Sequence, residues 1–338
     1  MSISSYTALA MQAKCYAINK YSTRAEVLQS MKDTLKRLDV QIFGAKKFIG
    51  PHLKLVVLPE YFMTSYPMGE NISAWREKAC IPKDHEIFQM IGDICKKHDI
   101  YFSGNYYEQD ENFPNLFFQA SFIVNDQGEY ILNYRRLNSM YSPTPHDVLD
   151  RYVALYGKES LFPVVDTPLG KLACIASEEI LYPEVARCLM MRGAEVFLHS
   201  SSEKGSPMLT RKNVAKRARA IENMAYVVSA NSGGIADHPI LENSTDGGSQ
   251  IVHYDGYLLC EASPGESVVA HGMIDIQALR SWRKTVSMKN YIARQRFDLY
   301  ADSYANHKHY PPNLFLENEP EKALFIKTQQ AVIDQLNQ

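Results

Sequence analysis

The chain has 338 residues, of which 46% are apolar and 22% are charged, a composition typical of globular proteins. Its formal net charge of −2 excludes a broad electrostatic footprint for nucleic acid or anionic lipid, so we expect neither as a partner. No apolar run approaches the ~20 residues that a membrane-spanning helix needs, and the N-terminal segment lacks the basic-then-apolar order of a secretion signal.

The cysteine pattern argues against a metal or redox site. Six cysteines are scattered without CxxC spacing, most of them among apolar neighbours. Such residues are typical of buried thiols in a reducing compartment, so we expect a cytoplasmic protein without a metal. No phosphate-binding loop or dinucleotide fingerprint is present, and we therefore expect no cofactor.

In the first half of the chain, apolar patterning predicts alternating strands and helices. Residues 53–60 (LKLVVLPE) are a nearly continuous apolar run that ends in an acid, as in a central strand covered on both faces. Strands at 115–125 and 129–137 are expected to pair as an antiparallel hairpin, and a loop is expected from there to residue 161. The other predicted elements are strands at 6–12 and 100–108 and helices at 23–47 and 86–98.

The second half continues the same alternation. A helix is predicted over 183–193, because Pro183 suits the first turn of a helix. The other predicted elements are strands at 162–167, 171–177, 194–201, 225–234, 249–256, 256–263 and 268–276, a helix at 208–224 and a terminal helical region. Without a long linker between the halves, this order predicts one α/β domain.

The densest basic run falls on the helix predicted over 208–224. We expect it to form a solvated helix face. Its members are Arg211, Lys212, Lys216, Arg217 and Arg219.

Polar residues stand at three predicted strand ends, where active sites of open α/β folds tend to lie. Glu60 ends the strand at 53–60, and Arg136 lies late in the strand at 129–137. Ser177 ends the strand at 171–177 and is followed by Glu178 and Glu179. Placement alone is a weak signal, because an acid after a strand is most often a solvated loop residue.

The residues around these positions resemble the nitrilase, or carbon–nitrogen hydrolase, superfamily. Five segments follow the order of that family: VVLPEYF, GEYILNYRRL, the stretch from GKLACIAS to FLHSS, RARAIENMAYVVSANSGG, and GGSQIVHYDGYLLCEA with MIDIQALRSWR. Four residues of the fourth segment are in register with the family pattern, namely Arg219, Glu222, Asn223 and Asn231. The resemblance covers roughly residues 6–284.

The resemblance implies an architecture and an assembly. The fold expected is α/β, a nitrilase-like four-layer α-β-β-α sandwich formed by residues 1–284. Residues 285–338 are expected to be a C-terminal extension that packs on the domain or on a partner subunit, since their aromatic side chains favour burial. Members of the family usually dimerise through helices, so we expect a homodimer or a higher homo-oligomer.

The resemblance also assigns roles. In the family a cysteine thiolate attacks an amide or nitrile carbon, a glutamate manages its proton, and a lysine with a backbone N–H holds the developing negative charge. Glu60 matches the glutamate, Arg136 stands at the lysine position and Ser177 at the cysteine position. Glu178 would supply the backbone N–H. Two of the three catalytic positions are therefore substituted.

These substitutions bear on the chemistry. A serine hydroxyl is far less acidic than a thiol and needs an efficient base, and a carboxylate is a weak base for that proton. Arginine keeps its charge and can stabilise an oxyanion, but it cannot give up a proton near neutral pH. A laboratory substitution would account for Ser177 but not for Arg136, so the pair favours a natural departure from the family.

Other residues offer partial replacements. Asp147 or Asp150 is a candidate for a second acid that many family members place in this loop, although a role at the loop surface fits them better. His146 is a candidate proton carrier. Cys174 lies three residues before Ser177, inside the predicted strand, and a register shift would be needed to expose it.

Three hypotheses remain open. The first is an amidase-like hydrolase of a small non-peptide amide with the altered Glu60–Arg136–Ser177 triad. The second is an enzyme without covalent catalysis that uses Glu60 as acid and base and Arg136 to clamp an anion, which favours a carboxylate-bearing ligand. The third is a non-catalytic member that binds a small molecule or a protein. Arg136 paired with Glu60 would neutralise both groups.

Overall fold

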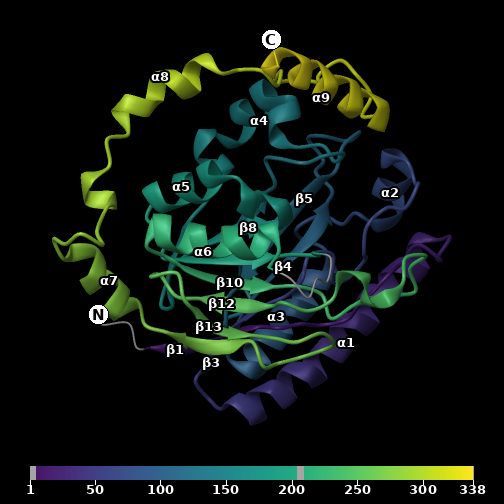
Figure 1. Cartoon of the computed structure of the whole chain (residues 1–338). Helices are drawn as coiled ribbons and strands as arrows, with labels where there is room; N and C mark the ends of the chain where they lie inside the picture. Colours follow the sequence, from purple (N-terminus) through teal and green to yellow (C-terminus); the bar gives the residue numbers. More distant parts are fainter. Residues whose placement is uncertain (1–4, 204–208, 338) are drawn as a thin grey trace.

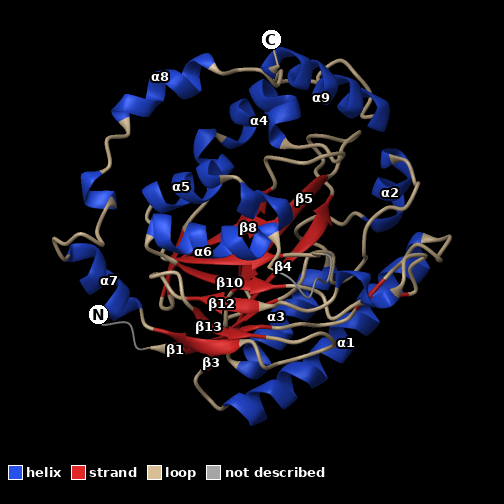
Figure 2. Ribbon diagram, in the orientation of Figure 1, coloured by secondary structure: helices blue, strands red, loops and turns tan. Residues whose placement is uncertain are grey.

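Two six-stranded sheets lie face to face, with helices on the outer face of each (Figures 1 and 2). The computed structural model describes residues 5–203 and 209–337. The strand order is β14-β1-β3-β4-β5-β6 in one sheet and β13-β12-β10-β9-β8-β7 in the other. The expected four-layer α-β-β-α sandwich is confirmed.

The strands are short and their bounds are as follows. The first sheet contains β1 (Tyr6–Ala10), β3 (Leu53–Val57), β4 (Tyr101–Glu108), β5 (Phe118–Val124), β6 (Tyr130–Arg135) and β14 (His271–Ile274). The second contains β7 (Val165–Thr167), β8 (Gly170–Ala176), β9 (Val196–Ser200), β10 (Tyr226–Ala230), β12 (Gln250–Val252) and β13 (Leu258–Glu261). A separate pair is formed by β2 (Cys15–Tyr16) and β11 (Ile235–Ala236).

Helices form the two outer layers. The layer beside the first sheet consists of α1 (Arg24–Ile49) and α3 (Glu86–His98), and the layer beside the second consists of α5 (Pro183–Met191) and α6 (Arg211–Asn223) (Figure 1). The remaining helices are α2 (Ile72–Ala79), α4 (Leu149–Tyr156), α7 (Ile276–Lys284), α8 (Asp298–Asn306) and α9 (Lys322–Leu336). No helix among the described residues is long and apolar enough to cross a membrane.

Burial on both faces explains the continuous apolar run of β3. Leu55 and Val57 lie in the core between the two sheets, whereas Val56 and Leu58 lie in the core beneath α1 and α3. Both sets of side chains are fully buried. The described residues therefore form two large apolar cores, one between the sheets that continues beneath α5 and α6 and one under the first helical layer.

Strand direction determines which residues meet. β3 and β4 are parallel, and the β4–β5–β6 meander brings β6 back in the direction of β4. Glu60 and Arg136, which follow β3 and β6, therefore leave the first sheet at the same edge. In the second sheet β8 and β9 are parallel, so Ser177 and Ser201 leave that sheet at one edge.

The region expected to be a loop before residue 161 is partly helical. It contains the 3₁₀ helices η1 (Pro145–Val148) and η2 (Lys158–Leu161) and, between them, α4. These elements are too short to show the apolar period that identifies longer helices. The helix expected over 208–224 covers Arg211–Asn223 in the described part of the chain, and position 208 lies outside the described residues.

The C-terminal extension follows the periphery of the same subunit. It runs from α7 past α8 to α9, which lies beside α4 (Figure 1). Phe315 and Phe325 of the extension are buried and form a third apolar cluster with five residues of the main domain. The five are Phe113, Leu116, Phe118, Val148 and Tyr152.

Candidate active site

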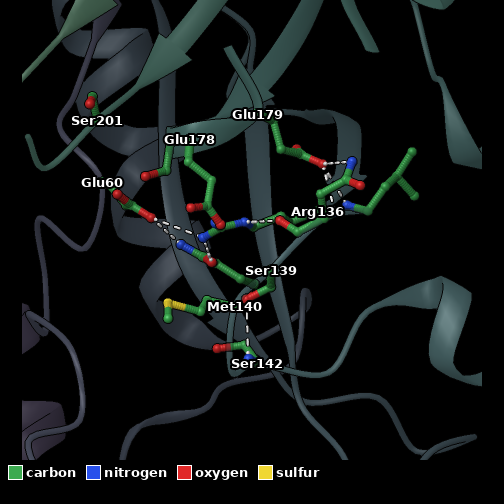
Figure 3. Close-up of polar contacts among 12 residues, drawn as sticks. Glu60, Arg136, Ser139, Met140, Ser142, Glu178, Glu179 and Ser201 are labelled. Atoms are coloured by element: carbon green, nitrogen blue, oxygen red, sulfur yellow. Dashed lines mark hydrogen bonds and ion pairs between the residues drawn. The ribbon is translucent and has the colours of Figure 1, made fainter. Parts of the chain in front are cut away.

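A cavity of about 850 Å³ lies where the two sheets bring these strand ends together. Glu60, Arg136, Ser177 and Glu178 all line it. Figure 3 shows Glu60, Arg136 and Glu178 converging on one point. The positions predicted for the glutamate, the charge-stabilising cation and the nucleophile therefore share one cavity, although they lie far apart in the sequence.

Glu60 is buried and held from two directions. Its backbone N–H donates to the carbonyl oxygen of Ser201 over 3.1 Å, which joins the end of β3 to the end of β9. Its Oε1 accepts a hydrogen bond from Gln119 Nε2 over 2.5 Å and lies 3.5 Å from Arg136 Nη1. No hydrogen bond joins Glu60 to Ser177 in the described part of the chain.

Arg136 is buried directly after β6, and protein groups occupy its guanidinium. Nε donates to the carbonyl oxygen of Asn138 and Nη1 to Gln119 Oε1, each over 2.6 Å. Nη2 donates to a carboxylate oxygen of Glu178. Because the guanidinium is paired with Glu60 and Glu178, internal carboxylates already neutralise the charge that an anionic ligand would need.

Ser177 is buried at the start of the 3₁₀ helix η3 (Ser177–Leu181). Its φ of +50° lies in the left-handed region, which costs a non-glycine residue free energy and is typical of functional turns. The carbonyl oxygen of Ser177 lies 2.8 Å from His199 Nε2. The turn that exposes the hydroxyl to the cavity is thus held through its own backbone.

The two acids after Ser177 have different roles. Glu178 lines the cavity and pairs with Arg136, and its backbone N–H follows the Ser177 position directly. Glu179 is fully buried and accepts hydrogen bonds from the backbone N–H groups of Leu137 and Asn138 over 2.8 and 2.9 Å. Glu179 therefore ties the segment after Arg136 to the turn that carries Ser177.

Lys212 is a site residue that the sequence analysis missed. Its Nζ lies 3.4 Å from Ser177 Oγ and 3.2 Å from Ser201 Oγ, and its side chain lines the cavity. Burial lowers its pKa, against the opposing charges of Glu60 and Glu203. The basic residues of α6 sit close together in the sequence, but nothing in their spacing distinguishes Lys212 from its neighbours.

The expectation of a solvated basic face on α6 is wrong for three of its five residues. Lys216 is fully buried beside Glu203, at 3.7 Å, and burial lowers its pKa to about 8. Arg219 is buried and donates to the carbonyl oxygens of Ile180 and Leu181. Lys212 faces the cavity, so only the remaining members, Arg211 and Arg217, are exposed. One face of α6 packs on η3 and the second sheet, and its basic side chains are buried there.

The candidates near residue 147 do not reach the cavity. The Asp147 carboxylate is buried, not at the loop surface, and caps η1 by accepting hydrogen bonds from the N–H and hydroxyl of Thr144. The backbone carbonyls of His146 and Asp147 accept hydrogen bonds from the C-terminal extension. The backbone N–H of Asp150 also donates a hydrogen bond to the extension, to the side-chain oxygen of Asn313. These residues hold the extension in place.

Cys174 lies inside β8 and is fully buried. Its Sγ lies 3.7 Å from Ser103 Oγ of the opposite sheet, and burial raises its pKa to about 12. Its thiol therefore belongs to the core between the sheets and does not line the cavity.

The sequence of this chain matches the carbon-nitrogen hydrolase family model over residues 8–284. The chain belongs to the carbon-nitrogen hydrolase family. The match ends at α7, so the extension lies outside it.

Two curated carbon-nitrogen hydrolase relatives are similar to most of the chain. The omega-amidase NIT3 of Saccharomyces cerevisiae is 23% identical over 261 residues, which are 76% of this chain and 85% of that protein. A formamidase of Bacillus thuringiensis is 28% identical over 262 residues, 75% of this chain and 71% of the formamidase. These identities are low.

Solved structures show the same fold. The structure of Saccharomyces cerevisiae Nit3, a member of branch 10 of the nitrilase superfamily, matches with a TM-score of 0.64 at 21% identity, covering 84% of this chain and 95% of Nit3. An amidase from Nesterenkonia sp. matches with a TM-score of 0.62 at 17% identity, covering 89% and 97%. At such identities the likeness concerns the fold alone.

Proposed function

We propose that this member of the carbon-nitrogen hydrolase family hydrolyses the C–N bond of a small non-peptide amide, with Ser177 as the nucleophile. One observation carries the proposal: the side chain of Ser177, on a strained turn at the end of β8, opens into the same cavity as Glu60 and Arg136. The omega-amidase and formamidase relatives support the reaction class.

The electrostatics of the cavity favour a neutral substrate. Arg136 is paired with Glu178 and Glu60, and Gln119 bridges Arg136 and Glu60 through hydrogen bonds to both. A carboxylate-bearing ligand would have to displace one of these internal partners. We therefore favour a neutral amide over the anion that an unpaired arginine would attract.

The walls of the cavity suggest what the substrate carries beside its amide. At about 850 Å³ the cavity lies in the upper part of the usual range for small-molecule sites. Six aromatic side chains line it, namely Tyr61, Tyr66, Trp75, Tyr107, Phe117 and Tyr141. Such a lining suits an apolar group on the carbonyl carbon, where formamide has only a hydrogen.

The two alternatives are less well supported. A non-covalent enzyme that clamps an anion requires Arg136 to face its ligand, whereas the guanidinium contacts Asn138, Gln119 and Glu178. A purely binding member has no need of Ser177 on a strained turn beside the amine of Lys212. It remains the alternative if no amide is hydrolysed.

The first test compares three matched proteins: the chain itself, Ser177→Cys, and Ser177→Cys combined with Arg136→Lys. Ammonia release is measured with amides of increasing apolar size, together with nitriles and carbamoyl compounds. We expect the unaltered chain to hydrolyse an apolar amide and Ser177→Ala to abolish the activity. Activity that appears only with cysteine at position 177 would contradict the serine nucleophile. If none of the variants releases ammonia from any compound, the binding role would be favoured.

A further inference from the structure

Lys212 occupies a position that the Glu60–Arg136–Ser177 arrangement does not explain. It is the second residue of α6, which begins after the N-cap Thr210, and its side chain extends into the cavity. There its Nζ lies 3.4 Å from the hydroxyl oxygen of Ser177. A second hydroxyl, that of Ser201 at the end of β9, lies 3.2 Å from the same nitrogen and orients it.

The other candidate bases are less well placed. Glu60 accepts a hydrogen bond from Gln119 and is paired with Arg136, and no hydrogen bond joins it to Ser177 in the described part of the chain. Nε2 of His199 lies 2.8 Å from the carbonyl oxygen of Ser177, so this nitrogen faces the backbone and not the hydroxyl. Among the residues that the structure describes, Lys212 is the base whose side chain reaches the reacting oxygen.

We propose that Lys212, as a neutral amine, is the general base that activates Ser177, so that the two form a serine–lysine pair within this cavity. The inference rests on Ser177 being the nucleophile of the proposed function. It adds a catalytic residue from α6 to the residues at the ends of β3, β6 and β8.

The proton balance of such a pair is complete without a further reactant. As the Ser177 Oγ–C bond forms, the hydroxyl proton moves to Lys212 Nζ. The resulting ammonium then protonates the leaving nitrogen, the C–N bond breaks, and an acyl ester on Ser177 remains. Water next attacks the ester while Lys212 accepts its proton. Return of that proton to Ser177 Oγ releases the acid and regenerates the neutral amine.

The surroundings of Lys212 favour a neutral amine. Burial lowers its pKa, and the charge of Arg136 acts in the same direction. Lys216 lies one turn further along α6, and no acidic residue stands in the first turn of this helix. Because Lys212 lies in the first turn, the positive end of the helix dipole also disfavours its ammonium form.

Carboxylates limit that effect. Glu60, Glu203 and Glu178 face Lys212 from the ends of β3 and β9 and from η3, and all three raise its pKa. We therefore expect activation of Ser177 to increase with pH, with an inflection below the ordinary lysine value.

The test uses a fluorophosphonate, which reacts with an activated serine whatever the natural substrate is. Intact mass and peptide mapping measure the rate at which Ser177 is labelled between about pH 6 and pH 10. Lys212→Met removes the amine at similar length. Lys212→Arg places a fixed positive charge there but cannot accept a proton. Arg211→Met removes an exposed positive charge next to Lys212 and is the matched control, and thermal melts check that each variant folds.

We expect the unaltered chain and Arg211→Met to be labelled at Ser177, and both Lys212 variants to react at least ~100-fold more slowly and without the inflection. Equal labelling of Lys212→Met, or no labelling of Ser177 in the unaltered chain, would overturn the proposal. Full labelling of Lys212→Arg would also overturn it, because a fixed cation would then suffice. Labelling that depends on Lys212 without hydrolysis of any amide would leave the pair standing and reject the proposed function instead.

Discussion

His199 supports Ser177 from behind the cavity. Its Nε2 lies 2.8 Å from the Ser177 carbonyl oxygen, and its Nδ1 lies 2.8 Å from Ser229 Oγ. Since a carbonyl oxygen only accepts, Nε2–H donates to it. In the neutral ring, which burial favours, Nδ1 carries no proton and accepts from the hydroxyl of Ser229. Burial lowers the pKa of His199 well below its ordinary value, and the charge of Lys216 lowers it further.

This depressed pKa predicts how stability varies with pH. Below about pH 6.5 the unfolded chain binds a proton at His199 that the folded chain does not. The stabilising contribution is therefore complete above about pH 6.5 and is lost as the pH falls, by about 1.4 kcal/mol per pH unit. Urea denaturation from about pH 7.5 to pH 5 measures it. His199→Gln, which can keep both hydrogen bonds, is expected to reduce the slope, whereas a change at exposed His307 is not. An unchanged slope in His199→Gln would contradict the assignment.

At the scale of elements, Glu179 joins the two halves of the candidate site. Glu179 lies in η3, which directly follows β8 of the second sheet. Its carboxylate nevertheless accepts hydrogen bonds from the segment that follows β6 of the first sheet. Tyr134 in β6 donates a third hydrogen bond to it over 2.6 Å. Burial raises the pKa of the Glu179 carboxyl, although Arg136 and these donors oppose the shift. The position of Arg136 relative to Ser177 thus depends on Glu179.

Replacing Glu179 by alanine leaves the N–H groups of Leu137 and Asn138 and the hydroxyl of Tyr134 without their acceptor. Because an unsatisfied buried donor costs about 1–3 kcal/mol, we expect a loss of roughly 3 kcal/mol or more in the free energy of unfolding. Glu179→Gln retains one carbonyl acceptor and should lose clearly less. Chemical denaturation measures both variants. Equal losses would mean that packing alone, not these hydrogen bonds, gives Glu179 its importance.

At the scale of the whole molecule, the C-terminal extension closes one side of the cavity. Pro320, Glu321 and Lys322 line it at the start of α9. Phe325, 1% exposed, packs against Phe315 with ring centroids 5.0 Å apart and anchors that helix on the main domain. The extension is therefore part of the wall that a substrate would meet.

Phe325→Ala removes the anchor of α9. By the usual cost of deleting a buried phenylalanine, we expect a loss of about 3–5 kcal/mol in the stability of the α9 contact. Limited proteolysis should then cleave first near the start of α9, and KM for an amide substrate should rise while Ser177 labelling persists. Leu336→Ala, at a side chain that is 61% exposed, is the control. Equal protease resistance in both variants would show that α9 does not depend on Phe325.

Apolar side chains on the outer surface of α5, α6 and α8 favour association. Met191, Val214 and Leu299 are 51%, 51% and 69% exposed. Both α6 and α8 contact α5, and exposed apolar side chains on adjacent helices favour a protein interface. We predict a homodimer or larger homo-oligomer in sedimentation velocity, and a shift toward monomer in Val214→Asp but not in Val40→Asp on α1. A monomer at all concentrations would contradict the prediction.

The sequence by itself determined the fold class and the edge at which the candidate site lies. Apolar periodicity identified β3, β6 and β8, and family-like flanking residues singled out Glu60, Arg136 and Ser177, because both signals are carried by residues close together in the chain. Only the tertiary structure decided which charges meet. It paired Arg136 with Glu178 and Glu60, directed Asp147 to a helix cap and brought Lys212 to Ser177. Contacts between side chains from different sheets and helices depend on how those layers stack, and no local pattern in the chain records that stacking.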